Sequence, residues 1–181
     1  MTAAPTYTPI ASYTATGNIT SYTFSSITGT YTDLVMVASI RCDVATYNNM
    51  NFTTVTLNGS TSSIYGLTAL YTRNTGSETI NSYSSGLQAG FNFGGSITTG
   101  STSTIFSNYI LNLNNYSNST TYKTVLNQIA SPSNLTTSDG VAMGVGVWRS
   151  TAAITSITFT PSNSANYVAG STFSLYGILA A

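Results

Sequence analysis

Apolar residues recur at every second position along much of this chain, and this period constrains the fold more than any other feature. Between residues 34 and 42, every even position is Leu, Met, Ala, Ile or Cys, whereas the odd positions are Val35, Val37, Ser39 and Arg41. Period two is typical of strands, whose side chains point to opposite faces in turn. Because both faces of this segment begin apolar, we expect a central strand that is buried on both sides near its start.

The segment 141–148 alternates in a different way. Its odd positions are Val or Met, and its even positions are Ala142, Gly144, Gly146 and Trp148. Small residues on one face of a strand allow a large group to approach closely. A third alternating set places Ile105, Tyr109, Leu111 and Leu113 opposite Asn108 and Asn112.

Helical periodicity is almost absent, and Gly-, Asn- and Asp-rich turn clusters separate the alternating segments. About ten short strands without intervening helices predict an all-β chain folded as an antiparallel β-sandwich, jelly-roll-like in type. We expect a short arm over residues 1–5, one domain over 6–181, and an irregular excursion at about 72–104, which is rich in Ser, Thr and Gly. The remaining expected strands are 6–14, 19–26, 51–58, 64–71, 86–93, 122–130, 153–160 and 172–179.

The composition excludes several classes of site. The chain has no His, a single Cys and only 4% charged residues. It therefore lacks the Ser-His-Asp and Cys-His catalytic sets and any His- or Cys-cluster zinc site, and we expect no metal and no cofactor. Cys42 falls inside an apolar strand and is interpreted as a small core residue. Four scattered cations balanced by four anions do not make a nucleic-acid-binding surface.

Neither a secretion signal nor a membrane segment is expected. The opening MTAAPTYTPI has no positively charged region followed by an apolar run, which a Sec-type signal needs. No uninterrupted apolar run approaches the ~20 residues of a spanning helix.

Asp33, Asp43, Glu78 and Asp139 are the acidic residues from which a paired-carboxylate hydrolase would have to be built. Asp33 and Asp43 flank one expected strand and would lie roughly 30 Å apart when extended, so they cannot pair with each other. We expect Asp33 to accept hydrogen bonds from turn N–H groups at the start of the strand, and Asp139 to belong to a turn. A hydrolase that uses Glu78 or Asp139 stays an open alternative.

Asp43 has a second alternative. With Asn48 and Asn49 it offers oxygen ligands to a calcium ion, but one carboxylate and two amides make a weak set. A polar loop is the preferred interpretation.

Tyrosine is the most frequent aromatic residue, with 13 copies. Tyr and Asn in loops can stack on a glycan and hydrogen-bond to it, although Tyr is also an ordinary strand residue with one polar end. We select Tyr65, Tyr71, Arg73 and Tyr83, close to the expected excursion, as a possible ligand or partner surface.

The scarcity of charge also bears on assembly. Sheet edges are usually protected by Lys, other charges or Pro, and this chain has one Lys and four Pro. Hydroxyl- and amide-rich surfaces cost less to desolvate than charged ones. We therefore expect a homo-oligomer, a trimer or larger, whose copies cover one another's surfaces.

Three stretches carry a family resemblance: TYTDLVMVASIR (30–41), WRSTAAITSITFTPSNSANYVAGSTFSLYGI (148–178) and YTPIASYTATGNITSYTFSSI (7–27). They resemble small β-sandwich virion proteins of tailed bacteriophages, many of which infect cyanobacteria and marine bacteria. The resemblance spans most of the chain but carries little of residues 72–104, and it transfers no catalytic residue.

The resemblance implies a virion protein that is assembled in the cytoplasm of a host bacterium. Its partners would be other copies of itself and the major capsid protein or tail proteins. We expect a non-enzymatic capsid decoration (cement) protein that binds across capsomers. The alternative is a tail-tip or fibre adhesin that binds a host surface glycan through Tyr-rich loops.

Overall fold

The computed structural model describes residues 6–43, 51–74, 78–96, 104–132 and 140–179. Within these ranges the chain forms twelve β-strands and no helix. No part of the described chain is a helix long and apolar enough to span a membrane. The prediction of an all-β fold is confirmed, with two strands more than the ten or so expected.

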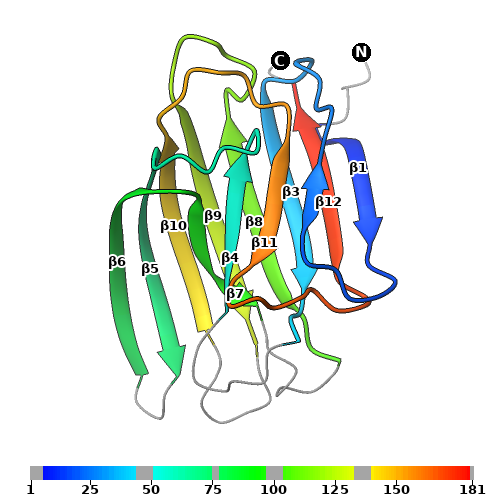
Figure 1. Ribbon diagram of the computed structural model, residues 1–181, viewed down its shortest axis with the longest axis vertical. Helices are drawn as coiled ribbons and strands as arrows, with labels where there is room; N and C mark the ends of the chain where they lie inside the picture. The colour runs from blue at the N-terminus through cyan, green and yellow to red at the C-terminus, as the bar shows by residue number, and fades with distance from the viewer. Residues whose placement is uncertain (1–5, 44–50, 75–77, 97–103, 133–139, 180–181) are drawn as a thin grey trace.

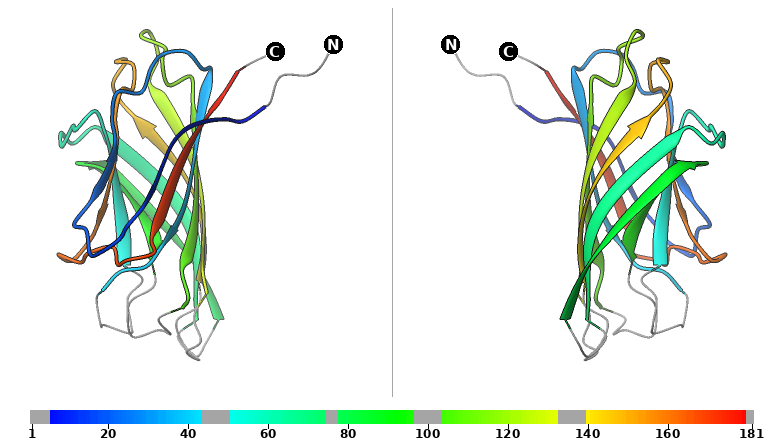
Figure 2. Two further views of the ribbon diagram at one scale, coloured as in Figure 1. Left: turned by 90° about the vertical axis from the view of Figure 1, so that its right-hand side faces the viewer. Right: turned by 90° about the vertical axis from the view of Figure 1, so that its left-hand side faces the viewer.

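The strands form two antiparallel sheets. In spatial order, the eight-stranded sheet contains β1 (Thr8–Thr14), β12 (Thr172–Ile178), β3 (Asp33–Ile40), β8 (Ser107–Asn114), β9 (Lys123–Ser131), β10 (Gly140–Trp148), β5 (Tyr65–Asn74) and β6 (Glu78–Gln88). The four-stranded sheet contains β2 (Tyr22–Phe24), β11 (Ile157–Pro161), β4 (Asn51–Leu57) and β7 (Phe91–Ser96). The two sheets form the layers of a β-sandwich (Figures 1 and 2). The sandwich is confirmed, whereas the finer jelly-roll assignment stays a prediction.

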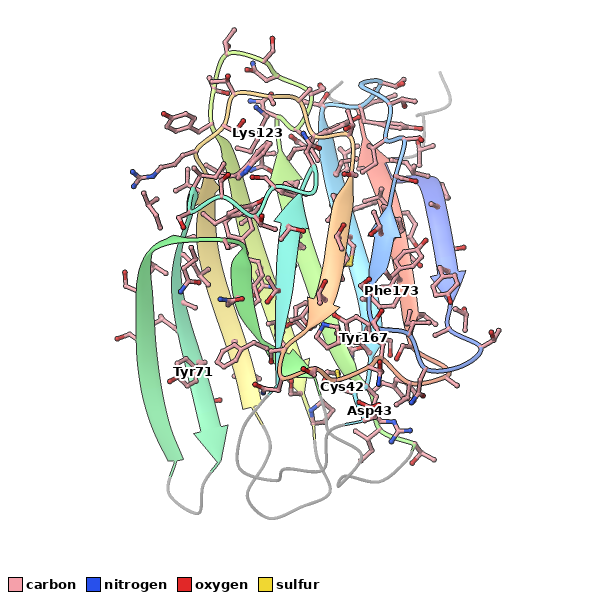
Figure 3. All side chains as sticks on the ribbon, in the orientation of Figure 1. Cys42, Asp43, Tyr71, Lys123, Tyr167 and Phe173 are labelled. Atoms are coloured by element: carbon pink, nitrogen blue, oxygen red, sulfur yellow. The ribbon has the colours of Figure 1, made fainter. Side chains whose placement is uncertain are left out.

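Aromatic side chains fill much of the space between the two sheets. Tyr22 of the small sheet stacks on Phe173 of the large one, with ring centroids 4.9 Å apart. Tyr65 meets Phe91 edge to face, also at 4.9 Å. Cys42 is fully buried in the same core, as its place in an apolar segment predicted (Figure 3).

Strand β3 is central, as its two apolar faces predicted. It pairs with β12 on one side and with β8 on the other. Leu34 and Val35 point to opposite faces and are both buried, whereas Val37 is 40% exposed. The strand is therefore buried on both sides only near its start, which matches the sequence pattern.

The stretch 72–104 is more regular than expected, so the prediction of an irregular excursion was wrong for its described part. It contains the end of β5, all of β6 and all of β7. Strand β6 pairs with β5 alone and lies at the sheet edge, so its sequence carries little of the apolar alternation by which a core strand is recognised. Residues 97–103 lie outside the described ranges.

The two edges of the large sheet differ in protection. Edge strand β1 carries Pro9, and its pairing with β12 shifts register between Pro9 and Ala11. Both features discourage pairing with another chain. Edge strand β6 (ETINSYSSGLQ) contains no Lys, Arg or Pro, but it begins with Glu78, and its pairing with β5 also shifts register, between Tyr65 and Leu67. Both edges therefore carry a register shift, and the proline is an additional protection of β1 alone.

Candidate functional site

Asp33 fixes a turn at the start of β3. Its Oδ1 accepts a hydrogen bond of 2.7 Å from the backbone N–H of Asn115, in the turn that follows β8. Asn115 has a positive φ of 52°, so this turn depends on a defined backbone conformation. The predicted role of Asp33 as a turn acceptor at the strand start is confirmed.

Asp43 holds a second loop at the opposite end of β3. Its carboxylate accepts hydrogen bonds from the backbone N–H and the side-chain amide of Asn166, each at 2.7 Å, and from Asn18 Nδ2 at 3.3 Å. Burial by itself raises the pKa of this carboxyl, but the hydrogen bonds outweigh burial, and the pKa lies below its usual value. These amide donors occupy oxygens that a calcium ion would need. Asn48 and Asn49 lie outside the described residues.

The described residues bring no acids together. They contain no group of three or more His, Cys, Asp or Glu residues that could hold a metal ion. Glu78 lies in β6, but its side chain is outside the described part, as is the whole of Asp139.

Tyr65, selected as a possible ligand contact, is a core residue instead. It is 0% exposed, and its hydroxyl donates to the carbonyls of Leu57 and Ser60 and accepts from the Leu57 N–H. Burial raises the pKa of this phenol. The prediction that Tyr65 faces a ligand was wrong, because its ring fills the space between β5 and Phe91.

The other selected residues are not brought together into a site that the structure describes. Tyr71 is half-buried in β5, near the end of the sheet opposite Lys123 (Figure 3). Arg73 and Tyr83 belong to β5 and β6, but their side chains lie outside the described part.

Lys123 is an unusual buried cation. The residue is 0% exposed, and its ammonium donates to the backbone carbonyls of Thr121 at 2.8 Å and Thr151 at 3.1 Å. Burial lowers the pKa of this amine. The side chain thus joins two loops at one end of the sandwich, and Asp43 lies near the other end (Figure 3).

Strand β10 has one face of small residues, for which the sequence predicted the close approach of a large group without identifying that group. Its small face points into the core, where a Cβ on Gly146 would lie 2.5 Å from Phe91 Cε1. The expectation that small residues admit a large group is confirmed, and that group is Phe91. The face of Val and Met residues points outward: Val141 and Val145 are each 55% exposed, and Met143 is 53% exposed.

These outward side chains belong to a larger surface, which we call the outer apolar face. It comprises exposed residues of β3, β8, β9, β10 and β5, namely Val37, Ile110, Leu126, Val141, Met143, Val145 and Leu70. The sequence of β10 contained a signal for this orientation. A strand face of Gly and Ala leaves room for aromatic rings, so that face is expected to point into the core and the opposite face outward.

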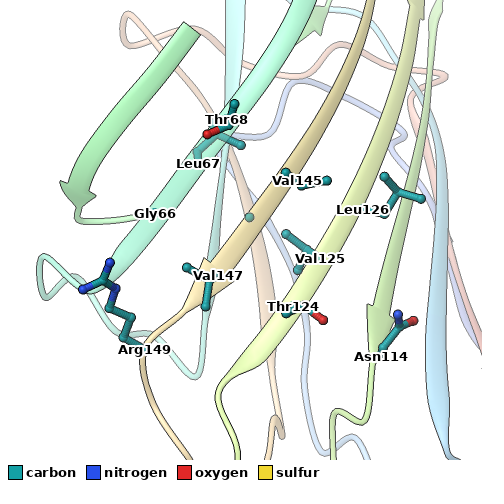
Figure 4. A pocket seen from close by; sticks show the side chains of 11 residues that line it. Gly66, Leu67, Thr68, Asn114, Thr124, Val125, Leu126, Val145, Val147 and Arg149 are labelled. Carbon is teal, nitrogen blue, oxygen red and sulfur yellow. The ribbon is translucent and has the colours of Figure 1, made fainter.

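A hollow of about 660 Å³ lies beside this face, over β5, β10 and β9 (Figure 4). Its lining includes Gly66, Val145, Val147, Thr124 and Leu126, together with Arg149. No acid and no aromatic residue lines it. Apart from Arg149, its lining is apolar or carries hydroxyl and amide groups.

No family model matches this chain, and neither a curated protein nor a solved structure matches it.

Proposed function

We propose that this chain is a non-enzymatic structural protein of a bacteriophage virion, a decoration (cement) protein that binds the capsid exterior across capsomers. The observation that carries the proposal is the outer apolar face: a broad sheet surface that combines exposed Val, Leu, Ile and Met with uncharged polar residues. A surface of this kind serves association better than catalysis.

The two acids with described side chains support a structural role. Asp33 and Asp43 each accept hydrogen bonds from loop amides, at opposite ends of β3. Because they lie at opposite ends of one strand, these two carboxylates do not form the pair that a paired-carboxylate mechanism requires. The resemblance of residues 7–27, 30–41 and 148–178 to phage virion proteins supplies the biological setting of the proposal.

The mechanism of a cement protein is mechanical. Each copy contributes a modest contact, and repetition over a symmetric shell raises the effective concentration of every further contact. A surface with few charges suits this task, because burying hydroxyl and amide groups costs less free energy than burying ions. Because the same contact repeats over the whole shell, the stability of the shell depends on the complete layer of copies.

Cryo-electron microscopy and mass spectrometry test the proposal on virions of the phage whose genome encodes this chain. We expect density for the sandwich on the head exterior, in stoichiometric amounts, and earlier heat disruption of particles assembled without it. Density only on the tail would overturn the cement role, and absence from the particle would overturn the virion role.

Glycan binding by a tail adhesin is the competing hypothesis. Tyr65 is excluded as a contact by its burial, which leaves Tyr71 as the half-buried candidate with a described side chain. A glycan array with the parent chain and the Tyr71→Ala variant separates the two roles. Parent binding that the substitution abolishes would favour the adhesin.

A further inference from the structure

The outer apolar face is continuous across five neighbouring strands. In the pairing register, Leu70 of β5 lies beside Met143 of β10, and Val145 lies beside Leu126 of β9. Ile110 of β8 lies beside Val37 of β3. Gln128 joins the two groups, because it pairs with Met143 on one side and with Ile110 on the other. The exposed side chains therefore form one patch.

The patch together with the rest of the eight-stranded face is large enough for a stable protein contact. Five strands ~4.8 Å apart, over about six residues of ~3.4 Å rise each, cover ~500 Å². The whole eight-stranded face covers ~900 Å² over about seven residues of each strand. A standard interface buries ~800 Å² per partner, with an apolar centre and a polar rim. The patch and its surroundings provide both parts.

The chemistry of the face favours a copy of itself as the partner. In β8, β9 and β10, the outward positions hold no charged residue: they are Asn108, Ile110, Asn112 and Asn114; Thr124, Leu126, Gln128 and Ala130; and Val141, Met143, Val145 and Val147. A two-fold contact places the same patch on both sides, so any charge near its centre would meet a like charge. Amide and hydroxyl groups both donate and accept, so identical polar rims can satisfy each other.

We propose that the outer apolar face packs against the same face of a second copy of this chain, as an isologous contact between two eight-stranded sheets. Sheets that pack face to face cross at about 30° because each is twisted. A two-fold contact makes a dimer or an assembly of dimers, in contrast to the trimer expected from the sequence. The inference deepens the proposed function, since a dimer would be the building unit of a cement layer: the outer apolar face would join the copies, and other surfaces of the dimer would contact the capsid. It rests on that function only for its biological use.

Sedimentation velocity on the purified chain tests the contact. We expect a dimer at micromolar concentration. The Met143→Lys/Val145→Lys variant, whose positions are more than half exposed, should weaken dimerisation by roughly 100-fold or more. Phe52→Lys is the matched control, because Phe52 is a 46% exposed apolar residue in β4 of the other sheet. It should leave the dimer unchanged.

Two additional variants keep the test decisive if the lysines impair folding. Met143→Gln/Val145→Thr is uncharged and compatible with a strand, and it should weaken the dimer by about 10-fold. Met143→Glu/Val145→Glu should be monomeric alone but pair with the lysine variant when the two are mixed, because opposite charges then face each other. Circular dichroism confirms folding in each case.

The outcomes are distinct from those of the virion experiment. A parent chain that is monomeric up to ~100 µM, where a standard-size contact should associate, would overturn the two-fold contact and leave the virion assignment standing. A dimer that survives all face variants, or a trimer, would place the interface elsewhere. A dimeric chain that is absent from the particle would overturn the proposed function alone.

Discussion

Substitution of Gly146 by alanine tests the packing of the two sheets most directly. Gly146 does not have a positive φ, so alanine is conformationally allowed there. Its new methyl group would lie 2.5 Å from Phe91 Cε1 and 2.8 Å from both Phe91 Cδ1 and Val125 Cγ2. These distances are too short for carbon atoms, and two different side chains surround the position. The ring or the strand must therefore move.

The expected change in unfolding free energy combines two opposing effects. Overpacking a core by one carbon costs roughly 1–3 kcal/mol. Replacing Gly by Ala also lowers the conformational entropy of the unfolded chain, which stabilises the folded state by about 0.4–1 kcal/mol. We expect Gly146→Ala to lose ~1–2 kcal/mol of unfolding free energy. In a domain of this size, that lowers the melting temperature by about 2–8 °C.

The control lies two residues away on the same face of the same strand. A Cβ on Gly144 would meet Ala69 Cβ at 3.3 Å and the Thr68 carbonyl at 3.4 Å, which small adjustments accommodate. Gly144→Ala should therefore stay within ~0.5 kcal/mol of the parent, since the strain is small and the entropic term opposes it. Thermal and guanidinium unfolding followed by circular dichroism measure both variants.

A double-mutant cycle identifies Phe91 as the cause. Phe91→Leu frees space beside Gly146, so Gly146→Ala should cost at least ~1 kcal/mol less in that background than alone. Equal losses for Gly144→Ala and Gly146→Ala, or additive effects with Phe91→Leu, would refute this account of how β7 packs on β10.

Three further outcomes follow from ionisable groups that are buried or hydrogen-bonded. Burial raises the pKa values of Tyr109 and Tyr167 above the value of about 10 in the unfolded chain. The contribution of these two phenols to stability should thus be constant up to pH ~10 and then fall by about 1.4 kcal/mol per pH unit for each phenol, measured as the guanidinium midpoint; a midpoint unchanged between pH ~10 and pH ~12 would contradict their burial. Lys123→Met leaves two loop carbonyls without their donor and should lower the unfolding free energy by roughly 2 kcal/mol, seen as a fall in melting temperature, and an unchanged melt would show that the ammonium is dispensable. Hydrogen bonds hold the pKa of Asp43 low, so its contribution is present above pH ~4 and lost as pH falls through the lowered value. Asp43→Ala should therefore destabilise the protein more at pH 7 than at pH 2, and equal losses would refute the role of the charge.

Local patterns predicted the parts of the fold that local chemistry determines. The placement of Cys42 in the core and of Asp33 at the start of β3 each follows from a few neighbouring residues. The position of Tyr65 could not be predicted in this way, because its burial depends on Phe91 from the other sheet. Strand β6 was missed because pairing with β5 defines it, while its own sequence is polar.

The outward face of β10 follows from the same long-range packing. Two sheets can be held apart by medium-sized residues from both sides, or by large residues from one side and small ones from the other. Here Phe91 supplies the volume, so β10 must present Gly146 inward. Because successive side chains of a strand point to opposite faces, that choice turns Val145 outward together with its apolar neighbours. The aromatic core and the exposed apolar face therefore have one structural cause, the packing of Phe91 against Gly146.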